Sequence, residues 1–70
     1  MNRTPVNSSN LASIGYDSQS EILEIEFHSG GVYQYDDVPM DVYTGLMQAS
    51  SHGKYFHAYV KNVYAYRRMR

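Results

Sequence analysis

The fold is decided by residues 21–36, which run Glu21-Ile22-Leu23-Glu24-Ile25-Glu26-Phe27-His28-Ser29-Gly30-Gly31-Val32-Tyr33-Gln34-Tyr35-Asp36. Apolar and polar side chains alternate from Leu23 to His28, as they do in a β-strand with one buried face. The glycine pair Gly30-Gly31 can adopt the positive φ angles that a tight reversal needs. The second arm is short and aromatic, and it ends in two aspartates that are typical of a loop. The stretch therefore predicts an antiparallel β-hairpin.

The register of this hairpin decides which way its two tyrosines face. A three-residue loop, residues 29–31, pairs Phe27 with Tyr33 and Ile25 with Tyr35, whereas a two-residue loop turns both tyrosines outward. The three-residue loop separates polar from apolar side chains more completely and is the favoured prediction. It puts five residues on the core face: Leu23, Ile25, Phe27, Tyr33 and Tyr35. The tyrosine rings are then expected in the core, with their hydroxyls at its rim.

A strand is expected before the hairpin. Residues 6–16 predict it, with Ala12, Ile14 and Tyr16 alternating on one face. Turn-forming residues 17–20 connect it to the hairpin. The three strands together form an antiparallel meander.

Two short helices are expected after the hairpin. The first starts at Pro39, a residue preformed for the first helical position, and runs to about residue 49. Gly45 inside this helix indicates close packing against a neighbour. The inward stripe consists of Val42, Leu46 and Met47. A break at residues 50–53 leads into the second helix, at about residues 54–61.

The last segment, residues 63–69, alternates again and is expected to be a fourth strand or an extended tail. Asn62 before it can end the second helix in a left-handed conformation. The predicted fold class is α+β: a three-stranded antiparallel β-meander, two short helices packed on one face, and the C-terminal extended segment or fourth strand.

The chain has 70 residues, which is the size of one small domain, expected at residues 6–70 after a flexible lead at residues 1–5. It has no cysteine, so neither a disulfide nor a thiolate metal site can stabilise it. No apolar run has the length of a membrane span, and the polar start is unlike a signal peptide. A soluble, cytoplasmic protein without membrane contact is expected.

Charge is distributed unevenly along the chain. Residues 1–50 carry seven acids and one base, a net charge of −6, whereas residues 51–70 carry five bases and no acid, a net charge of +5. The asymmetry predicts a surface for an anion, or pairing of the two halves within the chain or between copies.

The sequence offers no catalytic set. Its histidines, His28, His52 and His57, lack metal-ligand spacing, and no serine lies in a nucleophile-elbow motif. Glu24 and Glu26 share an exposed strand face, which is typical of a solvated edge. We expect no enzyme activity, no metal and no cofactor.

The basic third predicts a nucleic-acid site. Ser51, Gly53 and Lys54 open the second helix, where free N–H groups can bind an anion. Cations interleaved with rings are typical of grooves for single-stranded nucleic acids. The expected phosphate contacts are Lys54, Lys61, Arg67, Arg68 and Arg70, and the expected stacking residues are Tyr64 and Tyr66. The alternative is an ordinary capped helix followed by a solvated basic tail.

Five segments resemble the KTSC domain, a small domain found at the C-terminus of some lysyl-tRNA synthetases and as stand-alone bacterial and phage proteins. The segments are Leu23-Glu24-Ile25-Glu26-Phe27, Gly30-Gly31-Val32-Tyr33-Gln34-Tyr35, Val38-Pro39, Ser51-His52-Gly53-Lys54-Tyr55-Phe56 and Tyr64-Ala65-Tyr66-Arg67-Arg68. The resemblance covers about residues 6–69 and implies RNA binding through the synthetase association.

Two functions are therefore expected as alternatives. The first is a non-enzymatic module that binds nucleic acid, either RNA or single-stranded DNA. The second is a protein-interaction module, such as a phage or bacterial accessory protein that binds a protein partner or associates weakly as a homodimer.

Overall fold

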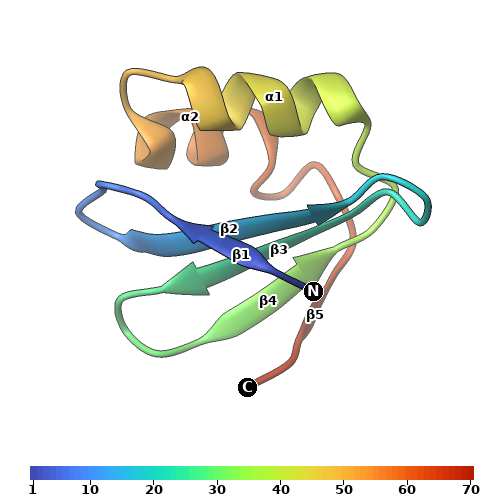
Figure 1. Ribbon diagram of the computed structural model, residues 1–70, viewed down its shortest axis with the longest axis horizontal. Coiled ribbons are helices and arrows are strands. Elements are labelled where there is room, and N and C mark those ends of the chain that lie inside the picture. Colours follow the sequence, from blue (N-terminus) through green and yellow to red (C-terminus); the bar gives the residue numbers. More distant parts are fainter.

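The computed structural model describes residues 1–70, in which two helices cover one face of a five-stranded antiparallel sheet (Figure 1). The elements in chain order are β1 (Arg3–Pro5), β2 (Leu11–Asp17), β3 (Ile22–Phe27), β4 (Val32–Tyr35), α1 (Met40–Gln48), α2 (His52–Tyr59) and β5 (Tyr66–Arg68). The strands lie in the sheet in the order β1-β2-β3-β4-β5, so each strand neighbours the next along the chain. The α+β class is confirmed, with two strands more than the meander.

The hairpin of β3 and β4 has a three-residue loop, but the loop starts one residue earlier than predicted. The Phe27 carbonyl accepts from Gly30 N at 2.9 Å, and Phe27 N donates to Gly31 O at 2.9 Å. Gly30 takes the left-handed conformation, with φ of 103°. The loop is therefore residues 28–30, a turn closed by a glycine bulge.

The shifted loop moves the strand pairing by two residues and leaves the faces unchanged. Ile25 lies opposite Tyr33, and Leu23 lies opposite Tyr35, so the predicted partners were wrong. Because side chains alternate with period 2, a two-residue shift keeps both tyrosines on the core face, as predicted. Tyr35 is buried and Tyr33 is half-buried.

A bulge in β2 corrects the predicted alternation of the strand before the hairpin. Leu11 pairs with Phe27 and Ser13 pairs with Glu26, which leaves Ala12 as the extra residue. Leu11, with no exposed surface, therefore takes the core position that the sequence assigned to Ala12.

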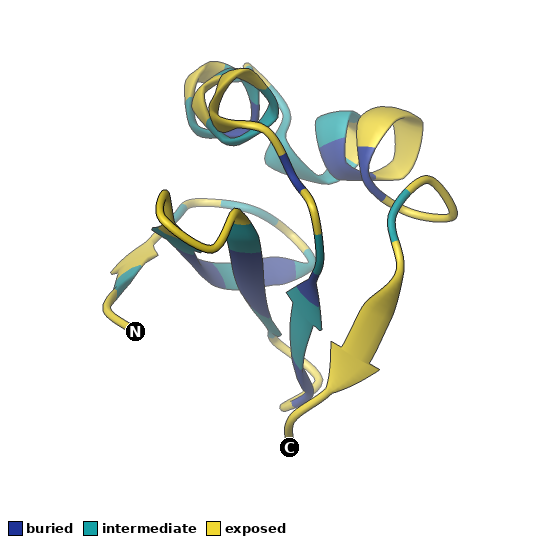
Figure 2. Ribbon diagram, turned by 90° about the vertical axis from the view of Figure 1, so that its right-hand side faces the viewer, coloured by how far each residue is buried: buried dark blue, intermediate teal, exposed yellow.

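The start of the chain also differs from the expectation of a lead before the domain. Residues 3–5 form β1, which pairs with residues 13–15 of β2 at one edge of the sheet. At the other edge, β5 pairs with β4, so the last segment is a strand. All three residues of β5 are exposed (Figure 2).

The core lies between the sheet and the two helices, where the buried residues gather (Figure 2). It consists of Leu11, Ile14, Leu23, Ile25, Tyr35, Val38, Leu46, Phe56 and Val60. Leu46 of α1 comes from the predicted inward stripe, while Val42 and Met47 pack at the margin of the core. A Cβ added at Gly45 would collide with the Tyr55 hydroxyl of α2, so the predicted close packing is confirmed.

The helix ends follow their capping residues. Pro39 is the N-cap of α1 and precedes the first helical residue, in contrast to the prediction. Ser51 is the N-cap of α2 and accepts a hydrogen bond from Lys54 N at 3.2 Å, so the helix begins at His52, two residues before the predicted start. Asn62, with φ of 64°, takes the predicted left-handed conformation after the helix. No helix is long and apolar enough to cross a membrane.

Candidate functional site

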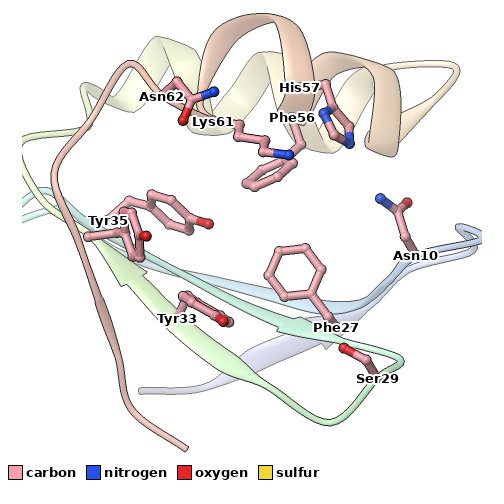
Figure 3. Close-up of a pocket in the computed structure, with 10 residues that line it drawn as sticks. Asn10, Phe27, Ser29, Tyr33, Tyr35, Phe56, His57, Lys61 and Asn62 are labelled. Atoms are coloured by element: carbon pink, nitrogen blue, oxygen red, sulfur yellow. The ribbon is translucent and has the colours of Figure 1, made fainter.

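A pocket of about 360 Å³ lies between α2 and the helix-covered face of the sheet (Figure 3). Its aromatic side chains come from β3, β4, α2 and β5, and its polar ones come mainly from loops and the end of α2. The lining residues are Asn10, Phe27, Ser29, Tyr33, Tyr35, Phe56, His57, Lys61, Asn62 and Tyr66. We call this the aromatic pocket.

The wall of the aromatic pocket is a continuous set of ring contacts. Phe27 packs edge-to-face on Phe56 and on Tyr33, with ring centroids 5.5 and 5.6 Å apart. Tyr66 is 5.8 Å from the rings of both Tyr33 and Tyr35. Tyr35 and Phe56 are almost completely buried, whereas Tyr66 is 61% exposed at the margin. The wall thus has a buried floor and one exposed ring.

The Tyr35 phenol is strongly affected by this environment. Burial, followed by the nearby phenols of Tyr33 and Tyr66, raises the pKa of Tyr35 to about 12. The group is therefore neutral at physiological pH and can act only as a hydroxyl donor or acceptor.

Two hydrogen bonds place Asn10 beside the pocket. His28 N donates to the Asn10 carbonyl at 3.0 Å, and His28 Nε2 donates to the Ser8 carbonyl at 2.9 Å. They connect the β1–β2 loop to the hairpin loop. The Asn10 amide also lies against Gly53, where an added Cβ would be 2.6 Å from Asn10 Oδ1.

Cations but no carboxylates surround the aromatic pocket. Lys61 is exposed. Its main-chain N–H donates a hydrogen bond to the Phe56 carbonyl at 2.9 Å, which holds Lys61 at the end of α2. Arg68 lies opposite Tyr33 in the sheet, and its guanidinium carbon is 5.7 Å from the Tyr33 ring centroid. Neither side chain pairs with an Asp or Glu, and no Asp or Glu lines the pocket. Arg68 Nε donates to the main-chain oxygen of Arg70 at 3.0 Å.

The structure separates the residues that the sequence grouped as one nucleic-acid site. Lys61 and Tyr66 line the aromatic pocket, and Arg68 lies over the ring of Tyr33, one of its lining residues. Arg67 and Arg70 belong to the opposite, open face of the sheet: Arg67 pairs with Asp36 at 3.1 Å, and Arg70 Nη2 is 3.5 Å from Glu26. Tyr64 is half-buried and packs against the core.

The predicted anion site at the start of α2 lies in a second, more open hollow of about 660 Å³. Ser51, Gly53 and Lys54 line it together with Ser9, Asn10, His57 and Ala58. The Ser51 hydroxyl already accepts the Lys54 N–H, so one of the free donors of this helix end is occupied. Asn10 and His57 line both hollows, which are therefore neighbours.

Comparison with known proteins identifies the family. The KTSC domain family matches residues 7–64. The chain belongs to the KTSC domain family. A crystal structure of a KTSC domain protein from Yersinia pestis matches with a TM-score of 0.96 at 39% identity, over 99% of this chain and 97% of that one.

Relatives of this KTSC domain occur both as small proteins and as parts of larger ones. An uncharacterised protein of Stutzerimonas stutzeri is 44% identical over 61 residues, which are 87% of this chain and 86% of that protein. A lysine–tRNA ligase of Trichormus variabilis is 41% identical over 54 residues, which are 77% of this chain but 10% of the ligase.

The open face of this KTSC domain carries a polar network in which Glu24 and Glu26 accept hydrogen bonds from neighbouring side chains. Arg3 donates to Glu24 and to Ser13, and Gln34 Nε2 donates to Glu24 Oε1 at 2.8 Å. Burial opposes the charge of Glu24, but the hydrogen bonds from Gln34 and Arg3 outweigh it and hold the pKa of Glu24 below its ordinary value. Part of the charge asymmetry of the sequence is therefore neutralised within the chain.

Most of the pocket lining was missed by sequence reasoning. Phe27, Tyr33 and Tyr35 were assigned to the core. Phe56 was given no role of its own, because the contact between the second helix and the sheet is not visible in the periodicity of either element. Asn62 was noted only for its backbone conformation, and His57 only for its unsuitability as a metal ligand. No group of three or more His, Asp or Glu side chains gathers as a metal site would require.

Proposed function

We propose that this KTSC domain is a non-enzymatic module that binds RNA at the margin of the aromatic pocket. Lys61 and Arg68 contact phosphates, and Tyr66 stacks on a base. One observation carries the proposal: two cations that pair with no Asp or Glu flank an exposed ring beside a pocket that no Asp or Glu lines. Sites for single-stranded nucleic acids combine positive side chains along the phosphate backbone with aromatic side chains that stack on the bases.

The choice of RNA is supported by the relatives. A segment matching 77% of this chain is part of a protein named lysine–tRNA ligase in Trichormus variabilis and in a Nostoc strain. A module joined to an enzyme that acts on tRNA is well placed to contact RNA. The chain spans about a tenth of those ligases, so the ligase activity itself is not part of the proposal.

The proposal uses only basic residues that pair with no Asp or Glu side chain. Arg67 and Arg70 are paired with Asp36 and Glu26, so releasing them to phosphate would leave those carboxylates without their partners. Lys54 lines the neighbouring hollow, so it serves as the control position for Lys61.

The test is titration of the protein into labelled single-stranded RNA and duplex DNA at low and physiological salt. Two phosphate contacts predict a slope of log affinity against log salt of about −1.4 on single strands. Lys61→Ala should lower the RNA affinity and flatten this slope by about half, while Lys54→Ala, the matched loss of one exposed lysine, should change both much less. Absence of RNA binding at low salt would contradict the proposal.

One observation favours the protein-interaction alternative. The outer edge of β5 has no neighbouring strand, and Val63, Tyr66 and Met69, all more than half exposed, lie on or beside it. Such an edge can accept a strand from another chain. Sedimentation over a range of concentrations tests self-association, and a constant monomer mass would exclude it.

A further inference from the structure

We infer that the aromatic pocket holds one unpaired nucleobase, so that the domain prefers RNA with a base outside the helix over fully paired RNA. This inference rests on the proposed RNA binding and adds to it a defined ligand and a selectivity. The site consists of the aromatic pocket, of which only Lys61 and Tyr66 were expected from the sequence.

The size and walls of the pocket suit a flat, apolar-faced group. Its volume of about 360 Å³ is within the range of small-molecule sites, about 300–1,000 Å³. In Figure 3, Phe27, Tyr33 and Tyr35 lie on the sheet side of the opening, and Phe56 lies on the α2 side. Because Phe27 and Phe56 are in edge-to-face contact, the rings of the two layers form one continuous floor for the ligand, and the exposed Tyr66 ring provides a surface at the margin.

The charges around the pocket exclude a cation. A cluster of aromatic rings can otherwise bind quaternary or methylated ammonium groups through the ring faces. Here Lys61 lines the pocket, the Arg68 guanidinium already lies 5.7 Å from the Tyr33 ring centroid, and no carboxylate is present to offset them. The occupant is therefore a neutral ring that carries a negative group, and a nucleobase on its phosphate has this combination.

The polar groups of the rim match the edge of a base. Asn62 offers an amide donor and an amide acceptor, Asn10 offers its amide N–H groups while its Oδ1 already accepts from Ser8 Oγ at 3.1 Å, and Ser29 and His57 offer further hydrogen-bonding atoms. Figure 3 shows Asn10 and His57 directed toward the opening from the side opposite Tyr35. Bases in single-stranded RNA are read in this way, by stacking on rings together with hydrogen bonds to their edges.

A paired base cannot enter such a pocket, because its edge and both its faces are already occupied within the duplex. Only a base that is looped out, or that lies in a single strand, exposes the groups that the pocket contacts. The inference thus predicts selection by pairing state, which phosphate contacts alone do not give.

The test compares three RNA duplexes with the same stem, each annealed from two strands, at one salt concentration: a fully paired duplex, the duplex with one unpaired base, and the same bulge with an abasic nucleotide. We expect the bulged RNA to bind about tenfold more tightly than the other two, a difference of about 1.4 kcal/mol. Tyr66→Ala should remove much of this preference and leave the abasic affinity nearly unchanged. Tyr59→Ala, which removes another exposed ring of α2 that does not line the pocket, should preserve the preference.

The outcomes separate the inference from the function on which it rests. Equal affinity for all three duplexes would overturn the base-binding pocket and leave the RNA-binding proposal intact. No binding to any duplex at low salt would overturn both. As a second measurement, uridine and adenosine monophosphates should shift the side-chain amide NMR signals of Asn10 and Asn62, whereas ribose 5-phosphate should not; equal shifts from all three would also contradict the inference.

Discussion

On the open face of the sheet, Arg67 lies between the Gln34 amide and the Asp36 carboxylate, whereas Arg68, the next residue, lies on the helix-covered side over the Tyr33 ring. The two side chains are alike in charge and length and differ only in the face to which β5 directs them. On the open face Arg67 meets one carboxylate, that of Asp36 after β4. The helix-covered face holds rings, so Arg68 pairs with no Asp or Glu, and its Nε donates to the main-chain oxygen of Arg70.

This contrast assigns different tasks to the two faces. Polar pairs on the open face hold the edge strands to the sheet, because Arg3 comes from β1 and Arg67 from β5. The helix-covered face supplies the core, and its margin supplies the aromatic pocket. The number of Lys and Arg residues in the sequence therefore overestimates the number of positive side chains that can contact a ligand.

The largest effect is expected from a change at the centre of the helix-covered face. Ile25→Ala removes a side chain with no exposed surface and should lower the free energy of unfolding by about 2–5 kcal/mol. Chemical denaturation measures the change. Val63→Ala, at a 59% exposed position, is the control and should shift stability by less than about 0.5 kcal/mol. Similar losses in the two variants would contradict the placement of the core.

Alkaline pH should weaken the same face through Tyr35. Its pKa of about 12 lies above the ordinary value of 10.0, so the unfolded chain releases this proton more readily. The stabilising contribution is complete below pH 10 and is lost as the pH rises toward 12. Burial also raises the pKa of Tyr16 and of Tyr55, so absorbance titration should show several late-titrating phenols, of which the last disappears in Tyr35→Phe. Persistence of the last phase in the variant would assign it to another tyrosine.

Acidic pH should weaken the open face through Glu24. The pKa of Glu24 lies below its ordinary value, so the unfolded chain takes up this proton first. The free energy of unfolding should therefore decrease as the pH falls below about 4.5. Denaturation between neutral and acidic pH tests this, and Glu24→Gln should show a smaller decrease. An identical decrease in the variant would show that other carboxylates are responsible.

The smallest effect is expected from the exposed pair at the edge of the open face. Arg67→Gln removes the contact with Asp36, in which the arginine side chain is 53% exposed, and should cost less than about 1 kcal/mol. The loss should shrink further at high salt, because solvent-exposed pairs are screened. A larger loss, independent of salt, would mean that the open-face network is more strongly coupled than its exposure indicates.

The sequence predicted the fold class, both helices and the core face shared by five hairpin residues, because period-2 alternation and capping residues are local signals. It did not predict the bulge at Ala12, the start of the turn at His28 or the burial of Glu24, which was expected on an exposed face, since each depends on how the strands pair. The pocket depends on contacts between segments far apart in the chain, such as Phe27 with Phe56. Periodicity placed Phe27 in the core and carried no sign of its contact with α2.

The most direct test of the central claim compares Arg68→Gln with Arg67→Gln for binding to single-stranded RNA. Both variants remove one positive charge, so any difference reports the face on which the charge lies. Arg68→Gln should reduce affinity and lower the salt slope by about 0.7, while Arg67→Gln should leave both nearly unchanged. Equal losses in the two variants, or a larger loss in Arg67→Gln, would contradict the assignment of the ligand to the aromatic side of the sheet.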